Sequence, residues 1–319
     1  MPQVGRRQVL LSAAGFAAGC SKSSTGRPRS KVAISRAAGY GQDLYDAVHR
    51  LLSELNAGFR GKRIVLKPNM VEFDPGTCIN TNPVFVHAVL ESCRRLGAAD
   101  VRIAEGPGHR RVTLDLADAA GYFNVIPKFE DLFVDLNLDD TTLVRMKKPH
   151  SKITELYLPN TALGADLLIS VPKLKTHHWV GATLSMKNLF GLVPSGIYGW
   201  PKNVLHWAGI HETIADLYGL FPKHFAVVDG IIGMEGNGPI QGAPRQAGLV
   251  IAGQDLASVD NICCRVMGID PEQIGYLAIA DSRCPFQLHN PEVIGEQPRS
   301  VRTDFQLLDV FSGLRLSRS

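Results

Sequence analysis

Short apolar runs alternate along this chain with longer amphipathic segments, and this alternation restricts the possible folds more than any other feature. Runs rich in Val, Ile and Leu are typical of buried strands, and they occur at residues 31–35, 63–67, 100–105, 167–171, 225–229 and 246–252. The segments that begin near residues 43, 83, 203 and 255 repeat apolar side chains at the period of a helix. Strands and helices in alternation predict an α/β fold with parallel or mixed doubly wound sheets.

The length of the chain suggests more than one domain. Its 319 residues are enough for about two domains of ordinary size. We expect a ligand cleft between two α/β lobes. The N-terminal lobe is expected at residues 31–125, the central and C-terminal lobe at 126–300, and a C-terminal tail at 301–319. Between the lobes the pattern loosens, and shorter strands are predicted at 132–136 and 153–158.

Residues 1–19 resemble a twin-arginine signal peptide rather than part of a fold. Arg6 and Arg7 precede an apolar segment, residues 9–18, that is too short to span a bilayer. Small residues then lead to Cys20, as in a bacterial lipobox, which predicts lipidation of Cys20 and a flexible tether at residues 20–30. The resemblance implies a protein that is exported already folded and is anchored by lipid to the bacterial membrane, in the periplasm or another extracytoplasmic space.

Charge and cysteine content argue against several classes of partner and cofactor. The 34 basic and 30 acidic residues leave a formal net charge of +4, too small to indicate a nucleic-acid-binding protein. Membrane contact is therefore expected through the lipid alone, and no nucleic acid is expected as a partner. Besides Cys20 the chain has five cysteines and no C-x-x-C pair, so no zinc site and no 4Fe-4S motif is predicted.

A basic segment follows the apolar run at residues 167–171, and it is the strongest candidate for a ligand site. Lys173, Lys175 and His177 come directly after this predicted strand, and Lys187 and Asn188 follow about ten residues later. Open α/β sheets bind ligands at the carboxyl ends of their strands, and lysines are seldom placed beside a core without a partner. The segment predicts a cationic site for a small anionic ligand, either a carboxylate or a phosphate.

Other segments that follow predicted strands are rich in glycine or polar residues. Loops are predicted at 68–81, 106–110, 173–178 and 230–242. No Walker loop occurs, and no G-x-G-x-x-G follows a strand and opens a helix. The expected ligand-binding residues in or beside these loops are Lys67, Asn69, Lys173, Lys175, Asn188, Asp229 and Glu235.

Five motifs resemble the domain of unknown function 362 family. They are K-P-N-M-V at 67–71, T-N-P at 81–83, V-P-K-L-K-T-H at 171–177, L-S-M-K-N-L-F-G at 184–191 and V-V-D-G-I-x-G-M-E-G-x-G-P at 227–239. The resemblance implies an α/β protein with an interdomain cleft and no established reaction. Some relatives carry ferredoxin-like cysteine motifs, and this chain does not.

A second resemblance is to lactate racemase-type enzymes, which use a nickel pincer nucleotide. His109, His177, Lys187 and His206 occur in the order of the functional residues of those enzymes. The resemblance implies that Lys187 tethers the cofactor, that His206 ligates the metal and that His109 and His177 exchange protons with the substrate. Imidazoles and a reactive amine suit such chemistry.

Three functions remain compatible with these residues. In the first, an enzyme holds a carboxylate or phosphate with Lys173, Lys175 and Lys187, while His177 moves a proton. In the second, the site uses a metal ion or the pincer nucleotide. In the third, an exported binding protein uses the cations for affinity alone. Histidines gathered in one pocket would favour an enzyme, because a binding protein needs no proton-transfer group.

Structural roles are open for the charged residues as well. If the stem of Lys187 is buried, its ammonium needs a salt bridge to Asp229 or Glu235, an anionic ligand, or a covalent link to a cofactor. Asp229 and Glu235 can be turn-forming acids, or in a functional role they can bind a metal or pair with Lys173 or Lys175.

The remaining candidates also have structural alternatives. Asn69 and Asn188 can act as turn formers, and His206 as a packing histidine beside a tryptophan. Asp255 is expected to cap a helix, and Asp260 on the same helix can face solvent.

Overall fold

A computed structural model describes residues 26–108 and 111–317 of the chain. The predicted signal peptide, Cys20 and His109 lie outside the described residues. The strands of the main sheet are β1 Lys31–Arg36, β2 Arg63–Pro68, β3 Asp100–Glu105, β4 Phe133–Asp135, β7 Leu167–Val171, β8 Lys173–His177, β9 Gly181–Thr183, β10 His224–Glu235, β11 Ala243–Gly253 and β12 Glu292–Gly295. A separate antiparallel pair consists of β5 Thr141–Arg145 and β6 Glu155–Pro159.

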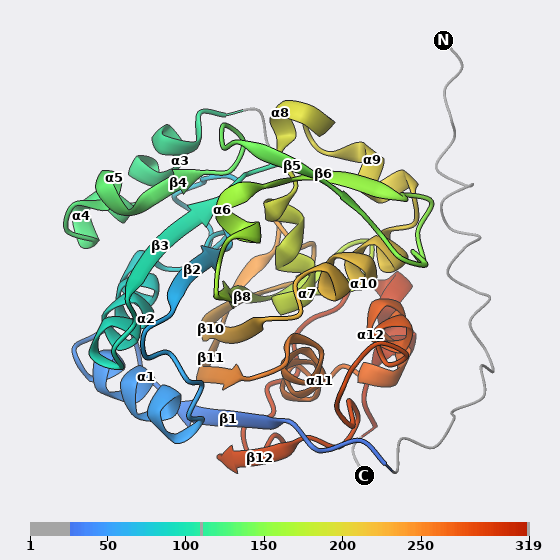
Figure 1. Cartoon of the computed structure of the whole chain (residues 1–319). Coiled ribbons are helices and arrows are strands. Elements are labelled where there is room, and N and C mark those ends of the chain that lie inside the picture. The colour runs from blue at the N-terminus through green and yellow to red at the C-terminus, as the bar shows by residue number, and fades with distance from the viewer. Residues whose placement is uncertain (1–25, 109–110, 318–319) are drawn as a thin grey trace.

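Helices cover both faces of the main sheet, as Figure 1 shows. The α-helices are α1 Asp43–Glu54, α2 Pro83–Arg95, α3 Thr113–Ala119, α4 Tyr122–Val125, α5 Phe129–Leu132, α6 Asn160–Leu163, α7 Ser185–Asn188, α8 Ser195–Tyr198, α9 Asn203–Trp207, α10 Ile210–Leu220, α11 Leu256–Val266 and α12 Gly275–Ala280. The 3-10 turns are η2 Leu189–Leu192, η3 Pro271–Gln273 and η4 Asp309–Leu314. This arrangement confirms the predicted doubly wound α/β class.

The centre of the sheet is parallel, and its strand order reverses at one point. The order is β12-β1-β11-β10-β7-β2-β3-β4, with β8 paired to β10 and β9 paired to β8. β10, β7, β2, β3 and β4 are parallel neighbours, so their carboxyl ends meet at one edge. From β2 the chain adds β3 and β4 on one side and later adds β7 on the other. Open α/β sheets bind ligands at such a switch point, which here lies between β2 and β7.

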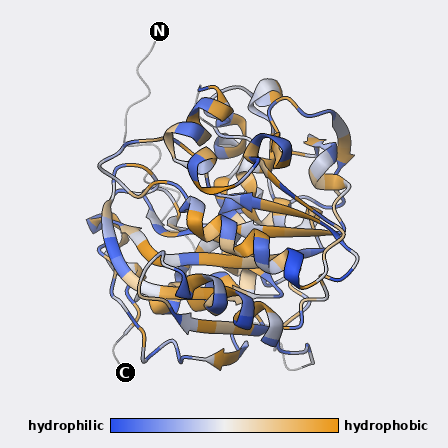
Figure 2. Cartoon of the chain, turned by 90° about the vertical axis from the view of Figure 1, so that its left-hand side faces the viewer, coloured by the Kyte–Doolittle hydropathy of each residue, from blue (hydrophilic) through white to orange (hydrophobic). Residues whose placement is uncertain are grey.

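Two apolar cores, one on each face of the sheet, hold the helices in place. In β2, Ile64 and Leu66 belong to the core that contains α1 and α2, whereas Val65 belongs to the core that contains α7, α10 and α11. This alternation follows from the two-residue period of a strand. Figure 2 shows the result, with largely apolar strands inside and hydrophilic residues on the outer turns of the helices.

The predicted helix cap at Asp255 is confirmed, and α2 has a side-chain cap of the same kind. The Asn82 side chain accepts a hydrogen bond from the backbone N–H of Val84 at the start of α2, and Pro83 occupies the first turn. The Asp255 side chain accepts from the backbone N–H of Ser258 at the start of α11. Each cap satisfies an amide that the helix itself leaves unpaired.

Three predicted segments differ from the structure. The loop expected at 173–178 is mostly strand β8, and the first part of the loop expected at 230–242 belongs to β10. The single helix expected at 203–220 is two helices, α9 and α10, because Gly209 between them has a left-handed φ of 105°. Strand β5 was not predicted. β1, β2 and β3 precede the expected lobe boundary at residue 125, and they share one sheet with β7, β10 and β11 beyond it.

Within residues 26–108 and 111–317, no helix has the length and apolar character needed to cross a membrane.

Candidate functional site

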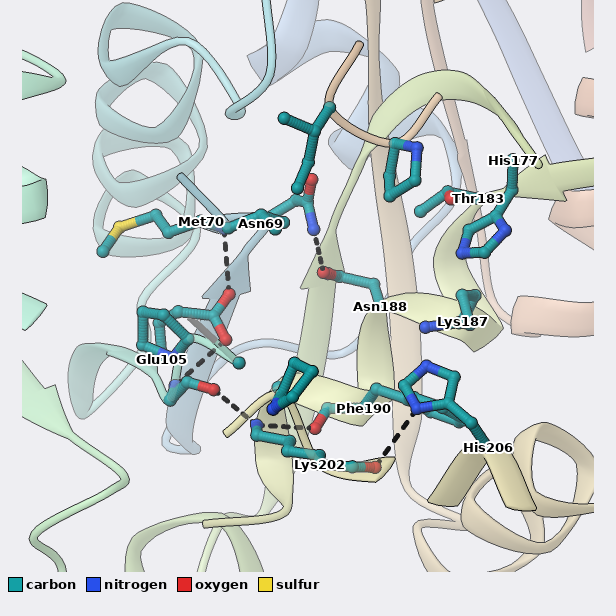
Figure 3. Close-up of a pocket in the computed structure, with 18 of the residues that line it drawn as sticks. Asn69, Met70, Glu105, His177, Thr183, Lys187, Asn188, Phe190, Lys202 and His206 are labelled. Carbon is teal, nitrogen blue, oxygen red and sulfur yellow. Dashed lines mark hydrogen bonds between the residues drawn. The ribbon is translucent and has the colours of Figure 1, made fainter. Parts of the chain in front are cut away.

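A cavity of about 260 Å³ lies at the carboxyl ends of β2 and β3, beside the switch point. Its walls come from the segments after β2, β3 and β8, from α7 and η2, and from α9 and the residues before it. Figure 3 shows this cavity. The predicted site residues that it brings together are Lys67, Asn69, His177, Lys187, Asn188 and His206.

A buried ion pair between β2 and β3 forms one wall. Lys67, 1% exposed, donates to the carboxylate of Glu105, which is equally buried. Lys67 Nζ also donates to the Asn188 side-chain oxygen at 2.9 Å. Burial lowers the pKa of Lys67, and the Glu105 carboxylate acts in the opposite direction. The Glu105 carboxylate also accepts from the backbone N–H of Met70 at 3.1 Å, so the pair fixes the turn after β2.

A glycine in η2 allows this pair to form. A Cβ atom at Gly191 would overlap both the Glu105 carboxylate and the Lys67 ammonium. The backbone of η2 can therefore approach the ion pair only because residue 191 has no side chain.

A buried carboxylate from α11 orients α7, which carries Lys187. Asp260 accepts from the backbone N–H groups of Ser185 at 2.7 Å and Met186 at 3.0 Å. The alternative in which Asp260 faces solvent is wrong, because Asp260 is 0% exposed. Burial raises the pKa of Asp260 to about 7.

Lys187 lies on the cavity wall without an ion-pair partner among the described residues. Its ammonium lies 3.7 Å from the centre of the Phe190 ring. Burial lowers the pKa of Lys187 to about 7, and the charges of Lys202 and Lys175 add to this effect. The predicted alternative of a structural salt bridge to Asp229 or Glu235 is therefore wrong.

Lys202 is a third lysine of the cavity wall, and the sequence analysis missed it. Its Nζ donates to the backbone carbonyls of Gly106 at 2.6 Å and Phe190 at 3.0 Å, and its side chain is buried. Burial lowers the pKa of Lys202 to about 7. Its backbone is left-handed, with φ of 61°, a conformation that costs a non-glycine residue about 1–2 kcal/mol. Such strain is common at functional sites.

Two histidines of the cavity have opposite hydrogen-bonding character. His177 Nδ1 accepts from the backbone N–H of Trp179 at 3.0 Å, so the neutral ring carries its proton on Nε2. His206 Nδ1 lies 3.2 Å from the Lys202 carbonyl, which can only accept, so Nε2 of the neutral ring is an unprotonated base. Figure 3 shows Lys187 between these two rings.

Both rings stay neutral near pH 7. Burial lowers the pKa of His177 well below its ordinary value, and burial lowers the pKa of His206 to about 4. In both cases the charge of Lys187 adds to the effect of burial.

A cofactor or a metal would have few anchors here. The Lys187 amine is a candidate for a covalent link, and Nε2 of His206 is free to ligate a metal. His178 also lines the cavity, and its Nδ1 lies 2.7 Å from the Gly238 carbonyl, which leaves its Nε2 available. In the part of the chain that the structure describes, no three His, Cys, Asp or Glu residues are grouped as a metal site.

Of the predicted site residues that the structure describes, four lie outside the cavity wall: Lys173, Lys175, Asp229 and Glu235. Lys173 forms a buried ion pair with Asp229 at 2.7 Å, and Tyr40 donates to the same carboxylate at 2.9 Å. Lys175 is fully buried and donates to two backbone carbonyls, and burial lowers its pKa to about 7. Glu235 lies near Arg245, with a closest N–O distance of 3.7 Å. The alternative in which Lys173 and Asp229 pair with each other is confirmed.

Two buried polar atoms of the cavity wall have no hydrogen-bond partner among the described residues. They are the side-chain oxygens of Asn69 and Thr183. Buried polar groups are almost always paired, so these two oxygens are free to accept from a bound molecule. Asn69 also donates to Asn188 at 3.3 Å, so neither asparagine is only a turn former.

Glu105 and Lys202 are the two functional candidates that sequence reasoning overlooked. Glu105 had a usable signal, since it is an acid at the carboxyl end of a predicted strand, where open α/β sheets bind ligands. Lys202 had none, because it follows a proline in a segment without periodicity.

A family model described as "Domain of unknown function (DUF362)" matches residues 64–265, which confirms the predicted family. A thylakoid-associated protein from Synechocystis sp. is 29% identical over 224 residues, covering 68% of this chain and 67% of that protein.

Two solved structures resemble this chain weakly. The lactate racemase apoprotein from Thermoanaerobacterium thermosaccharolyticum matches with a TM-score of 0.46 and 16% identity, over 76% of this chain and 58% of that one. A protein from Thermotoga maritima matches with a TM-score of 0.39 and 11% identity, over 78% of this chain and 60% of that one. The chain therefore spans less than two thirds of the length of either.

Proposed function

The chain belongs to the domain of unknown function 362 family, and we propose that it is an enzyme acting on a small anion, either a carboxylate or a phosphate, bound in the cavity beside β2 and β3. The charge of the cavity wall carries this proposal. Lys67, Lys187 and Lys202 line it, whereas Glu105 is the single carboxylate among the described lining residues. A partly enclosed cationic cavity favours an anionic ligand.

We assign the anion to Lys187 and Lys202, because Glu105 already neutralises Lys67. Both lysines have pKa values lowered to about 7. A bound anion favours their charged forms and raises these pKa values again. Binding therefore takes up protons, and affinity falls as the pH rises above 7.

The histidines provide the reason to propose an enzyme rather than a binding protein. His177 offers an N–H and His206 offers a free imidazole nitrogen in the same cavity. One ring can donate a proton to the substrate while the other accepts one. Burial is the main cause of the low pKa values of both rings, and the charge of Lys187 adds to it. A bound anion offsets the part due to Lys187 and so raises both pKa values.

Binding and proton transfer are tested with separate variants. A panel of small carboxylates and phosphates is titrated by calorimetry, and ligands that bind are incubated in D2O and followed by NMR. Lys187→Met should weaken binding about tenfold or more, because a charge-assisted hydrogen bond contributes ~1.5–3 kcal/mol. His206→Phe should bind the anion and fail to exchange its C–H proton for deuterium. Lys152→Met, at an exposed position that does not line the cavity, is the matched control.

Each outcome has a distinct meaning. Absence of binding by any anion would refute the proposal as a whole. Binding that depends on Lys187, without exchange in the unaltered protein, would support a non-catalytic binding protein instead.

A second candidate is an enzyme that uses a cofactor linked to Lys187. Its amine has no carboxylate partner among the described residues, and its pKa is lowered to about 7, so a covalent link to a cofactor is chemically open. A metal held at His206 would act as a Lewis acid toward the anion. Protein purified from its own host should then show excess mass on the tryptic peptide that contains Lys187, together with bound metal. Unmodified peptide and no metal would reject this form.

We also propose that the mature protein is exported and attached to the membrane by lipid at Cys20. The support is the twin-arginine pattern at Arg6 and Arg7 and the small residues before Cys20. The description of its relative as thylakoid-associated is in keeping with membrane attachment.

Fractionation tests the anchor. Cys20→Ala should release the protein from the membrane fraction, because no acyl chain can be added. Cys78→Ala, which alters a cysteine of the folded domain, should stay membrane-bound. A Cys20→Ala protein that survives a high-salt wash in the membrane fraction would contradict the lipid anchor.

A further inference from the structure

All three tryptophans of the chain are exposed, and they occur in two segments that also form the cavity. The exposed fraction is 48% for Trp179, 43% for Trp200 and 77% for Trp207. Trp179 lines the cavity itself, Trp200 precedes the lining residue Pro201, and Trp207 follows His206. Tryptophan is usually among the more buried residues of a protein. Its exposure at every position near one cavity calls for a functional reason.

An aromatic row leads from the inside of the cavity to the surface. The buried Phe190 ring lies 5.5 Å from the His206 ring, and the His206 ring lies 5.0 Å from the Trp179 ring, both edge to face. The inner end of the row carries charge, because the Lys187 ammonium lies over Phe190. The outer end is half-exposed indole. The row therefore changes from cationic to apolar along its length.

Two more exposed apolar side chains lie in the segment that contains Trp200 and Trp207. Ile197 on α8 and Val204 on α9 are also exposed, at 48% and 38%. Hydrogen bonds fix the segment between them against the cavity wall, from Ser195 to the Pro107 carbonyl and from Lys202 to the Gly106 carbonyl. The exposed side chains are thus carried on a segment that is anchored at the cavity.

We propose that the ligand of this cavity is an amphipathic anion. Its carboxylate or phosphate head binds Lys187 and Lys202, and its hydrocarbon or aromatic part lies along Phe190, His206 and Trp179 toward the outside. A cavity of about 260 Å³ accommodates a small head, and pockets for whole drug-sized ligands are usually larger. The tail therefore leaves the cavity over the exposed tryptophan. This inference rests on the proposed function, since it assumes that the cavity binds an anion.

A homologous series of ligands tests this assignment. Straight-chain carboxylates from acetate to decanoate are titrated by calorimetry at monomeric concentrations, with tryptophan emission recorded in parallel. Affinity should rise about fourfold per methylene until the tail passes the rim, and the emission should shift to the blue. Straight-chain alcohols of equal length, which lack the charge, should bind at least tenfold more weakly.

Variants separate the two parts of the site. Trp179→Ala should reduce the gain per methylene while leaving acetate affinity within about twofold, because the backbone N–H of Trp179 still bonds His177. Lys187→Met should weaken every chain length by the same factor. Val310→Ala is the control, because it shortens an exposed apolar side chain that does not line the cavity. It should change neither the gain per methylene nor the affinity for acetate.

The outcomes distinguish this inference from the proposed function. Carboxylates that bind through Lys187 with no dependence on chain length would overturn the amphipathic ligand and leave the anion site intact. If neither these carboxylates nor alkyl phosphates of the same lengths bind, the proposed function is refuted. Neutral phosphatidylcholine vesicles that alone produce the same emission shift would overturn the inference too, because the tryptophans would then face a bilayer.

Discussion

At the scale of single residues, the cavity lysines Lys187 and Lys67 should respond differently to mutation. The Lys187 ammonium has no carboxylate partner among the described residues, and burial lowers its pKa to about 7. Lys187→Met should therefore keep or raise the melting temperature of the ligand-free protein, since no buried acid is left unpaired. Lys67→Met should lower the melting temperature strongly, because it orphans Glu105, and breaking such a pair costs ~3–5 kcal/mol. Differential scanning calorimetry of the two variants side by side makes the comparison. A large loss of stability in Lys187→Met would return this lysine to a structural role.

At the scale of elements, the approach of η2 to β2 and β3 depends on Gly191. A methyl group there overlaps the buried Lys67–Glu105 pair. We expect Gly191→Ala to lower the free energy of unfolding by ~1–3 kcal/mol, the usual cost of overpacking a core, and to weaken anion binding. Urea unfolding measures the change. Gly39→Ala is the matched control, because a Cβ at Gly39 meets no atom within 4 Å. Equal stabilities for the two variants would show that η2 can move away from the pair.

At the scale of the whole molecule, the buried lysines make stability depend on pH. Burial lowers the pKa values of Lys175 and Lys202 to about 7 in the folded protein, whereas an unfolded lysine titrates near ~10.4. Above pH 7 the unfolded chain therefore binds more protons than the folded one, and the free energy of unfolding rises with pH. Each of the two lysines contributes up to ~1.4 kcal/mol per pH unit.

The effect of the lysines on stability is best measured between pH 7 and about 8.5, because cysteines of the unfolded chain titrate above this range. Burial raises the pKa values of Cys93 and Cys284 to about 12, and these thiols act in the opposite direction at higher pH. Urea unfolding at half-unit steps of pH measures the slope, which should fall by ~1.4 kcal/mol per pH unit in Lys175→Met. A stability that is flat or falls across this window would show that these lysines stay protonated in the fold.

The sequence by itself determined the elements and the edge of the sheet where the site lies. Apolar spacing is a local property, so β2, β3 and β7 were predictable from it, and the residue type at Asp255 predicted the cap of α11. Parallel strands bring their carboxyl ends to one edge. For that reason Lys67 and His177, distant in the chain, could be expected near each other.

Only the tertiary structure decided which polar residues line the cavity. Lys173, Lys175 and His177 alternate along β8 and so share one face of it, but each step of two residues moves the side chain by ~6.6 Å. Lys173 thereby meets Asp229, Lys175 is enclosed, and His177 reaches the cavity. These outcomes depend on the register of β8 against β10, which no local pattern encodes.

The same holds for the residues that the sequence analysis missed or misjudged. Glu105 and Lys202 are brought together by β3 and the segment before α9, which are about a hundred residues apart in the chain. Asp260 lies under α7 because α11 packs there, although the sequence left an exposed position open for it. Periodicity specifies which face of an element is buried. Whether a buried charge is paired, capped or left open to a ligand depends on which distant segment packs against it.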